Sequence, residues 1–80
     1  MRINKLIQVF KEEFEIPSDI EVKSNTNFRD IITWSSMNAL VVIILIENEY
    51  DVIVADEALK PLNTFQELYD LIIRKKEESE

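Results

Sequence analysis

Cysteine, histidine and glycine are all absent from this sequence of 80 residues. Without cysteine, the chain has no disulfides, no thiolate nucleophile and no zinc site built on cysteine. Without histidine, it lacks the side chain whose ordinary pKa best suits proton transfer near neutral pH. Without glycine, the sequence contains neither the P-loop nor the dinucleotide-binding fingerprint, since both motifs require glycine. These absences exclude most common catalytic and nucleotide-binding motifs.

Basic residues are also scarce. Nine Lys and Arg residues stand against sixteen Asp and Glu residues, which gives a formal net charge of -7. Proteins that bind duplex nucleic acid use clustered cations to replace the counterions of the phosphates, so this balance predicts no nucleic-acid partner. An acidic domain is instead attracted to basic patches on partner proteins.

The chain has no long hydrophobic run. Its longest apolar stretch, residues 39–46, has eight residues, whereas a membrane-spanning helix needs about 20. The first ten residues alternate charged and apolar side chains and so lack the apolar block of a signal peptide. We therefore expect a soluble, cytoplasmic, monomeric protein with no membrane insertion. Its length predicts one domain over residues 1–80, and a chain of this size buries about 60% of its unfolded surface.

A helix is predicted over residues 2–15. Its apolar side chains recur at the spacing of one helix face, which is formed by Ile3, Leu6, Ile7, Phe10 and Phe14. Pro17 disfavours continuation, because the residue before a proline is pushed out of the helical region. Residues 17–33 then show no sustained period and are rich in turn-forming residues. They predict a long loop, and loops of this length often serve a function.

Residues 36–49 allow two interpretations. The β-branched run 39–46 could be a buried strand that pairs with residues 51–55 in a hairpin, but no primed-turn dipeptide joins the two segments. Ser35 is a good N-cap, and the length suits a buried helix. The helix is the favoured prediction, and the hairpin would make the protein an unassigned α+β domain.

The C-terminal third predicts two more helices. Asp56 can cap a short helical turn that ends before Pro61. Thr64 and Glu67 have the spacing of a capping box at the start of a last helix, whose apolar face comprises Phe65, Leu68, Leu71 and Ile72. Residues 75–80 are expected to fray into solvent.

The predicted fold class is therefore all-α: a bundle of three main helices and one short helix, with a long loop between the first and second. Its apolar interior is expected from Ile7, Phe10, Phe14, Leu40, Ile43, Ile46, Tyr50, Val54, Leu62, Leu68 and Ile72.

The adjacent serines Ser35 and Ser36 have three possible roles. A serine nucleophile needs a neighbouring base and an oxyanion hole, and the lack of histidine and glycine removes the usual forms of both. We therefore expect no enzymatic activity. A helix cap alone would also account for the pair, since serine is a common N-cap residue. The third role is covalent attachment, because the first turn of a helix is exposed and its N–H groups and dipole stabilise a bound phosphate.

Residues 28–72 contain three motif blocks: the serine pair followed by Met37, the segment "ENEYDVIVADEA", and the segment "LNTFQELYDLI". Together these blocks resemble an acyl carrier protein. That family has a D-S-L motif at the start of its second helix, and its serine bears 4'-phosphopantetheine; Ser36 falls on this serine and Met37 on the leucine. The segment "ENEYDVIVADEA" resembles the family's E-E-x-F-x-I-x-I-P-D-E stretch, and "LNTFQELYDLI" resembles its I-x-T-V-x-D-x-x-x-x-I close. The three blocks align without a gap. The aspartate of the motif is Ser35 here, and its upstream glycine is absent.

The resemblance implies a carrier function. A phosphopantetheinyl transferase would attach the arm to Ser36, and the arm would hold an acyl group as a thioester for acyl-transferring or acyl-modifying enzymes of lipid, fatty acid, polyketide or related biosynthesis. The alternative is a small acidic helical interaction module that keeps the fold and is not modified.

The resemblance also implies that partners bind the second helix. The expected partner-binding residues are Met37, Asn38, Val41, Ile44, Leu45, Glu47, Asn48 and Asp56. Asn38, Val41, Leu45 and Asn48 lie on one helical stripe, where typical members of the family have acids. Either this stripe is an apolar docking patch, or Val41 and Leu45 face the core of a rotated helix.

Overall fold

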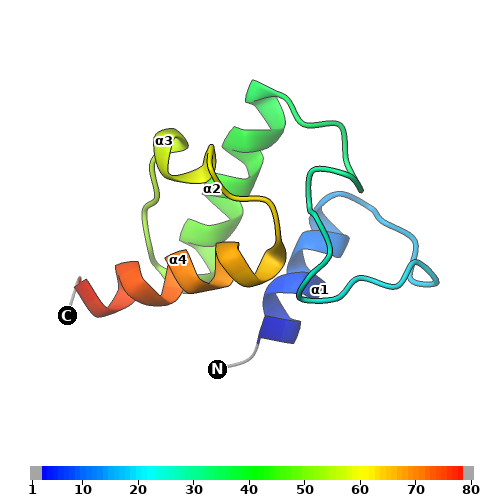
Figure 1. Ribbon diagram of the computed structural model, residues 1–80, viewed down its shortest axis with the longest axis horizontal. Coiled ribbons are helices and arrows are strands. Elements are labelled where there is room, and N and C mark those ends of the chain that lie inside the picture. Colours follow the sequence, from blue (N-terminus) through cyan, green and yellow to red (C-terminus); the bar gives the residue numbers. More distant parts are fainter. Residues whose placement is uncertain (1–2, 79–80) are drawn as a thin grey trace.

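The computed structural model describes residues 3–78, which form four helices: α1 (Ile3–Glu13), α2 (Ser36–Tyr50), α3 (Asp56–Leu59) and α4 (Phe65–Glu78). These residues contain no strand, only an isolated bridge between Asn27 and Thr64. The all-α prediction is confirmed, and a hairpin over residues 39–55 is excluded. α1 packs on α2 and α4, and α2 contacts α3 and α4; Figure 1 shows the loop between α1 and α2 on the side of α1 away from α3.

α1 ends in a Schellman motif that has no glycine. The N–H of Ile16 donates to the carbonyl of Lys11 at 2.9 Å, and the N–H of Glu15 donates to that of Glu12 at 3.3 Å. Glu15 has the left-handed φ of 55° that this motif requires. Since glycine usually occupies such a position, Glu15 adopts this conformation at a steric cost.

α2 has defined hydrogen bonds at both ends. Ser35 precedes it in extended conformation, and its hydroxyl accepts from the N–H of Asn38. At the other end, Asp51 is left-handed (φ 57°), and its N–H donates to the carbonyl of Glu47 at 2.9 Å. The helix buries Ala39, Val42, Leu45, Ile46 and Tyr50. Packing of these side chains outweighs the modest preference of the β-branched residues for strands.

The short helix α3 begins differently from the prediction. Ala55 is its N-cap residue, without a side-chain hydrogen bond, and Asp56 is the first helical residue. The prediction that Asp56 caps this turn is therefore wrong. As an acid in the first turn, Asp56 still favours the helix through the helix dipole.

The start of α4 agrees with the prediction, and its end does not. The N–H of Glu67 donates to the Thr64 hydroxyl at 3.2 Å, and a Glu67 carboxylate oxygen accepts from the N–H of Thr64 at 3.0 Å. This confirms the capping box. The helix continues to Glu78, so residues 75–78 are helical rather than frayed, and residues 79–80 lie outside the described part. Lys76 donates to the carbonyl of Tyr50 at 3.0 Å, which fastens this last turn to the end of α2.

The core lies between the four helices and is rich in phenylalanine. Phe10, Phe28 and Phe65 are fully buried, and the rings of Phe10 and Phe65 meet edge to face at 4.9 Å. Of the predicted core residues, Phe14, Ile43 and Leu62 are half-buried against this cluster. Leu40 is 52% exposed, so its assignment to the core was wrong. The remaining predicted core residues are buried: Ile7, Phe10, Ile46, Tyr50, Val54, Leu68 and Ile72.

Candidate functional site

The two serines at the start of α2 have different environments. The hydroxyl of Ser35 is the helix cap and accepts from the N–H of Asn38 at 3.1 Å. Ser36 is the first helical residue, its side chain is exposed, and no hydrogen bond of that side chain is seen among the described residues. Ser36 is therefore the serine whose hydroxyl is available to another molecule.

The segment that leads into the serines is fixed by side chains. The side-chain amide of Asn38 donates to the carbonyl of Thr33. The half-buried ring of Trp34 lies 5.3 Å from that of Phe28, centre to centre. The Arg29 guanidinium lies over the Trp34 ring, 4.5 Å from its centre. These contacts hold the backbone next to Ser36 against the core.

Arg29 also connects this segment to α3. Its guanidinium donates to the carbonyls of Leu62 and Leu59 at 2.8 Å and to that of Lys60 at 2.9 Å. The carbonyls at the end of a helix have no partner within the helix, so one arginine satisfies the end of α3 and positions Trp34 at the same time.

The start of α2 favours an anion. The first turn contains no acidic residue, and residues 36–46 contain no charged residue at all. The unpaired N–H groups and the dipole of the helix therefore act on a group at Ser36 without a competing carboxylate. A phosphate attached to the Ser36 hydroxyl would lie at this end of the helix.

The outward face of α2 is apolar. Met37 is 70% exposed, Leu40 52% and Ile44 47%, and their spacing of three and four residues places them on one stripe. We call these three residues the apolar stripe. Glu47 and Asn48 are exposed at the next turn, and Asp56 is exposed at the start of α3.

The sequence left open whether Val41 and Leu45 face solvent or the core, and the exposed stripe lies about one residue away from the one considered there. Leu45 is buried, and Asn38 and Val41 are only half-buried, while Asn48 is exposed. A docking patch centred on Val41 and Leu45 is therefore wrong for Leu45, which packs in the core. Leu40, which the sequence placed in the core, takes its place on the surface.

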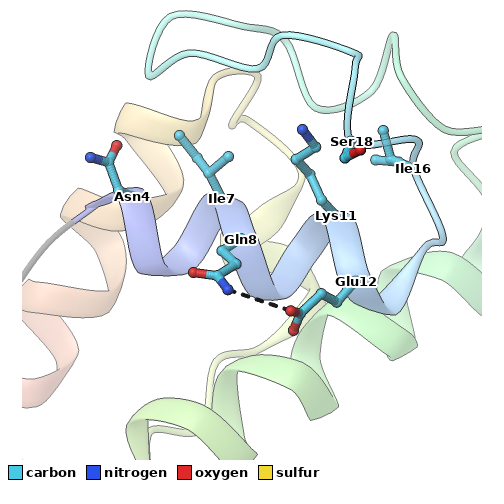
Figure 2. A pocket seen from close by; sticks show the side chains of 7 residues that line it. All are labelled: Asn4, Ile7, Gln8, Lys11, Glu12, Ile16 and Ser18. Carbon is cyan, nitrogen blue, oxygen red and sulfur yellow. Dashed lines mark hydrogen bonds between the residues drawn. The ribbon is translucent and has the colours of Figure 1, made fainter.

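A concave region lies on α1, away from the serines in sequence. It has a volume of about 380 Å³ and is lined by α1 and the first residues of the following loop. Figure 2 shows Gln8 hydrogen-bonded to Glu12 along its edge, and Lys11 donates to the carbonyl of Ile20 at 2.7 Å. Gln8, Glu12 and Lys11 thus have hydrogen-bond partners within the protein. Residues 3–78 contain no cluster of three or more acids that could hold a metal ion and no helix able to cross a membrane.

The arrangement of helices matches solved structures of carrier proteins. The holo acyl carrier protein from Geobacter metallireducens superposes with a TM-score of 0.76 and 26% identity, over 96% of this chain and 87% of that one. The chain has the acyl carrier protein fold. An acyl carrier protein from Thermotoga maritima gives a TM-score of 0.72 and 24% identity, over 100% of this chain and 96% of that one. No protein-family model and no curated protein matches the sequence significantly.

Sequence reasoning missed parts of this candidate site. The role of Arg29 was not predicted, because its partners lie some thirty positions further along the chain. Trp34 directly precedes the two serines in the sequence, and nothing there indicated its contact with Arg29. A lone arginine in a loop of turn-forming residues was the one available signal, since a charged residue there needs either solvent or a partner.

Proposed function

We propose that this protein is an acyl carrier whose attachment residue is Ser36. The observation that carries the proposal is that the two serines differ in position: Ser35 caps α2, whereas the exposed Ser36 occupies the first turn of this helix. The chain that contains them has the acyl carrier fold. The protein would be a cytoplasmic monomer without enzymatic activity of its own, serving lipid, polyketide or related biosynthesis.

The modification would follow from the chemistry of the serine and of coenzyme A. The Ser36 oxygen attacks the phosphorus that bears pantetheine, a phosphodiester bond to Ser36 forms, and the pyrophosphate bond of coenzyme A breaks to release adenosine bisphosphate. The phosphopantetheinyl transferase supplies the base for the serine proton, so the carrier needs no histidine. The thiol of the arm then holds an acyl group as a thioester, and the reactive chemistry lies in the arm.

The partner-binding face would be the apolar stripe with its acidic border. Met37, Leu40 and Ile44 offer apolar contact area beside the arm, Glu47 is exposed one turn further along α2, and Asp56 is exposed at the start of α3. Interfaces of this kind combine an apolar centre with a polar rim. Asn38, Val41 and Asn48 would contribute at the edges, whereas Leu45 supports the face from within the core.

Mass spectrometry tests the attachment. Incubated with coenzyme A, magnesium and a broad-specificity transferase, the protein should gain the mass of one phosphopantetheine group. Ser36→Ala should abolish the gain. Ser35→Ala, the matched control one residue away, should keep it, at a lower rate because the cap is lost. Labelling that disappears only in Ser35→Ala would show that the neighbouring serine is the attachment site.

A specific observation favours the alternative function, an interaction module that is not modified. The residue before Ser36 is a serine, whereas the family's motif has an aspartate there that the transferase recognises, and the first turn of α2 contains no acid. Failure of several transferases to label the wild-type protein would support the module, in which the apolar stripe alone would bind a partner protein.

A further inference from the structure

The core contains one polar atom that the fold does not explain. Tyr50, the last residue of α2, is only 5% exposed. Its hydroxyl is the one buried side-chain nitrogen or oxygen of residues 3–78 without a hydrogen-bond partner. A buried hydroxyl in this state has given up its hydrogen bonds to water without replacement. Phenylalanine would fill the same space without that loss.

The hydroxyl is a donor at neutral pH. Burial raises the pKa of Tyr50, and the neighbouring Tyr69 and Glu49 raise it further. The group therefore keeps its proton, and it can donate to a carbonyl or hydroxyl oxygen. Tyr69 and Glu49 are near enough to affect this hydroxyl, but neither forms a hydrogen bond with it, and the other buried residues of the core have apolar side chains.

The position of Tyr50 relative to Ser36 limits what could reach it. The two residues are at opposite ends of α2, which at 1.5 Å per residue is about 21 Å. Tyr50 belongs to the core cluster, to which α3 contributes Leu59 and α4 contributes Ile72. Only the distal part of a long group attached through Ser36 would arrive there.

An acyl chain that reaches Tyr50 has to enter the apolar interior next to α2. Methylene groups leave water for an apolar environment with a gain in free energy. α3 covers one side of this interior with four residues and has no side-chain cap. A helix this short is not stable by itself, and its position depends on the buried side chain of Leu59 and on the hydrogen bonds from Arg29, which a chain entering beside it would have to disturb.

We infer that the acyl group carried on Ser36 is long and has a hydroxyl or keto oxygen in its distal part, to which the Tyr50 hydroxyl donates a hydrogen bond. The inference rests on the proposed function, since it presupposes the arm on Ser36. A saturated chain would leave the hydroxyl unpaired, and a short chain would not reach it.

Acyl chains with one hydroxyl at different positions test this. Dodecanoyl-coenzyme A and a series of hydroxydodecanoyl donors, with the hydroxyl moved carbon by carbon, are loaded onto the wild-type protein and Tyr50→Phe by a transferase. Melting temperatures are then compared. At one or two adjacent positions the hydroxyl should raise the melting temperature of the wild-type protein by about 4–8 °C relative to Tyr50→Phe, after subtraction of the saturated pair.

Each outcome supports or overturns the proposed hydrogen bond from Tyr50 to the acyl group. The unloaded Tyr50→Phe protein should melt at or above the wild-type temperature; a lower value would show that the hydroxyl already has a partner and would overturn the inference. Successful loading with no position-dependent difference between the two proteins would overturn it as well, while the proposed function stands. Failure to load wild-type Ser36 at all would refute the proposed function and this inference with it.

Discussion

The guanidinium of Arg29 lies 4.5 Å from the centre of the Trp34 ring, while its N–H groups bind the carbonyls of Leu59 and Lys60 at the end of α3 and that of Leu62 shortly after it. One side chain thus connects the segment before Ser36 with the short helix beside the core. A cation over an indole ring and a planar set of donors are both properties of arginine that lysine does not reproduce.

Arg29→Lys should therefore destabilise the protein despite retaining the charge. Loss of two or more hydrogen bonds and of the ring contact is expected to lower the free energy of unfolding by about 1–2 kcal/mol, which is about 4–16 °C in a domain of this size. Because Trp34 is the only tryptophan, its fluorescence should also change. Arg74→Lys, the same substitution at an exposed position of α4, is the control. Equal melting temperatures for the two variants would contradict the role of Arg29.

Glycine substitutions at Glu15 and Glu13 should have opposite effects. Glu15 has a left-handed backbone, which glycine adopts without steric cost, so Glu15→Gly should leave stability unchanged or raise it by up to about 1 kcal/mol. Glu13 is the last residue of α1, where glycine should cost about 0.5–1 kcal/mol. Chemical denaturation of both variants gives the comparison, and a similar loss in both would show that Glu15 is not strained.

Two leucines of α2 should respond differently to a charge. Leu45→Glu places a carboxylate in the core and should cost several kcal/mol, enough to unfold a small domain at moderate temperature. Leu40→Glu adds a charge to the exposed stripe and should change stability by about 0.5 kcal/mol or less. Thermal melts distinguish them. If Leu40→Glu unfolds the protein as well, α2 is rotated differently from the orientation described here.

The same Leu40→Glu variant separates folding from partner binding. A folded Leu40→Glu protein should be loaded at Ser36 and then transfer its acyl group to a partner enzyme more slowly than the wild type, because the apolar stripe would be interrupted. Gln66→Glu, an exposed change on α4, adds the same charge outside the stripe and serves as the control. Equal loss of transfer in both variants would point to net charge rather than to the stripe.

The capping box of α4 should make stability depend on acid pH. Hydrogen bonds from the N–H groups of Thr64 and Asn63 lower the pKa of Glu67 from its ordinary value of 4.5. A carboxyl whose pKa is lower in the folded state stabilises the fold above the unfolded value, and the contribution disappears as the pH falls through the folded value.

Glu67→Gln isolates this contribution. At neutral pH the variant should melt below the wild type, and the difference should shrink as the pH falls below about 4.5. Melting curves of both proteins across the acid range provide the measurement. A difference that persists unchanged to the lowest pH would mean that the charge of Glu67 has no part in the cap. Glu57→Gln, at an exposed acid of α3, is the matched control.

Local patterns in the sequence were sufficient for the helices and for the N-terminal caps of α2 and α4, although not for the cap of α3. The apolar spacing of α1, the N-cap at Ser35 and the capping box of Thr64 and Glu67 depend only on residues within one or two turns of each other. Such interactions form in the same way wherever the helix is placed. For the same reason the sequence placed Ser36 in the first turn of α2.

The orientation of α2 was decided by tertiary structure. Residues 39–46 are apolar on every side of the helix, so no polar residue marks the outer face, and the sequence could not tell that Leu40 is exposed and Leu45 buried. Packing against α1, α3 and α4 selects one face of a helix that is apolar all round. The last turn of α4 is similar: its polar sequence predicts fraying, and the bond from Lys76 to the carbonyl of Tyr50 fastens it. These contacts join residues far apart in the chain, and a local pattern does not contain them.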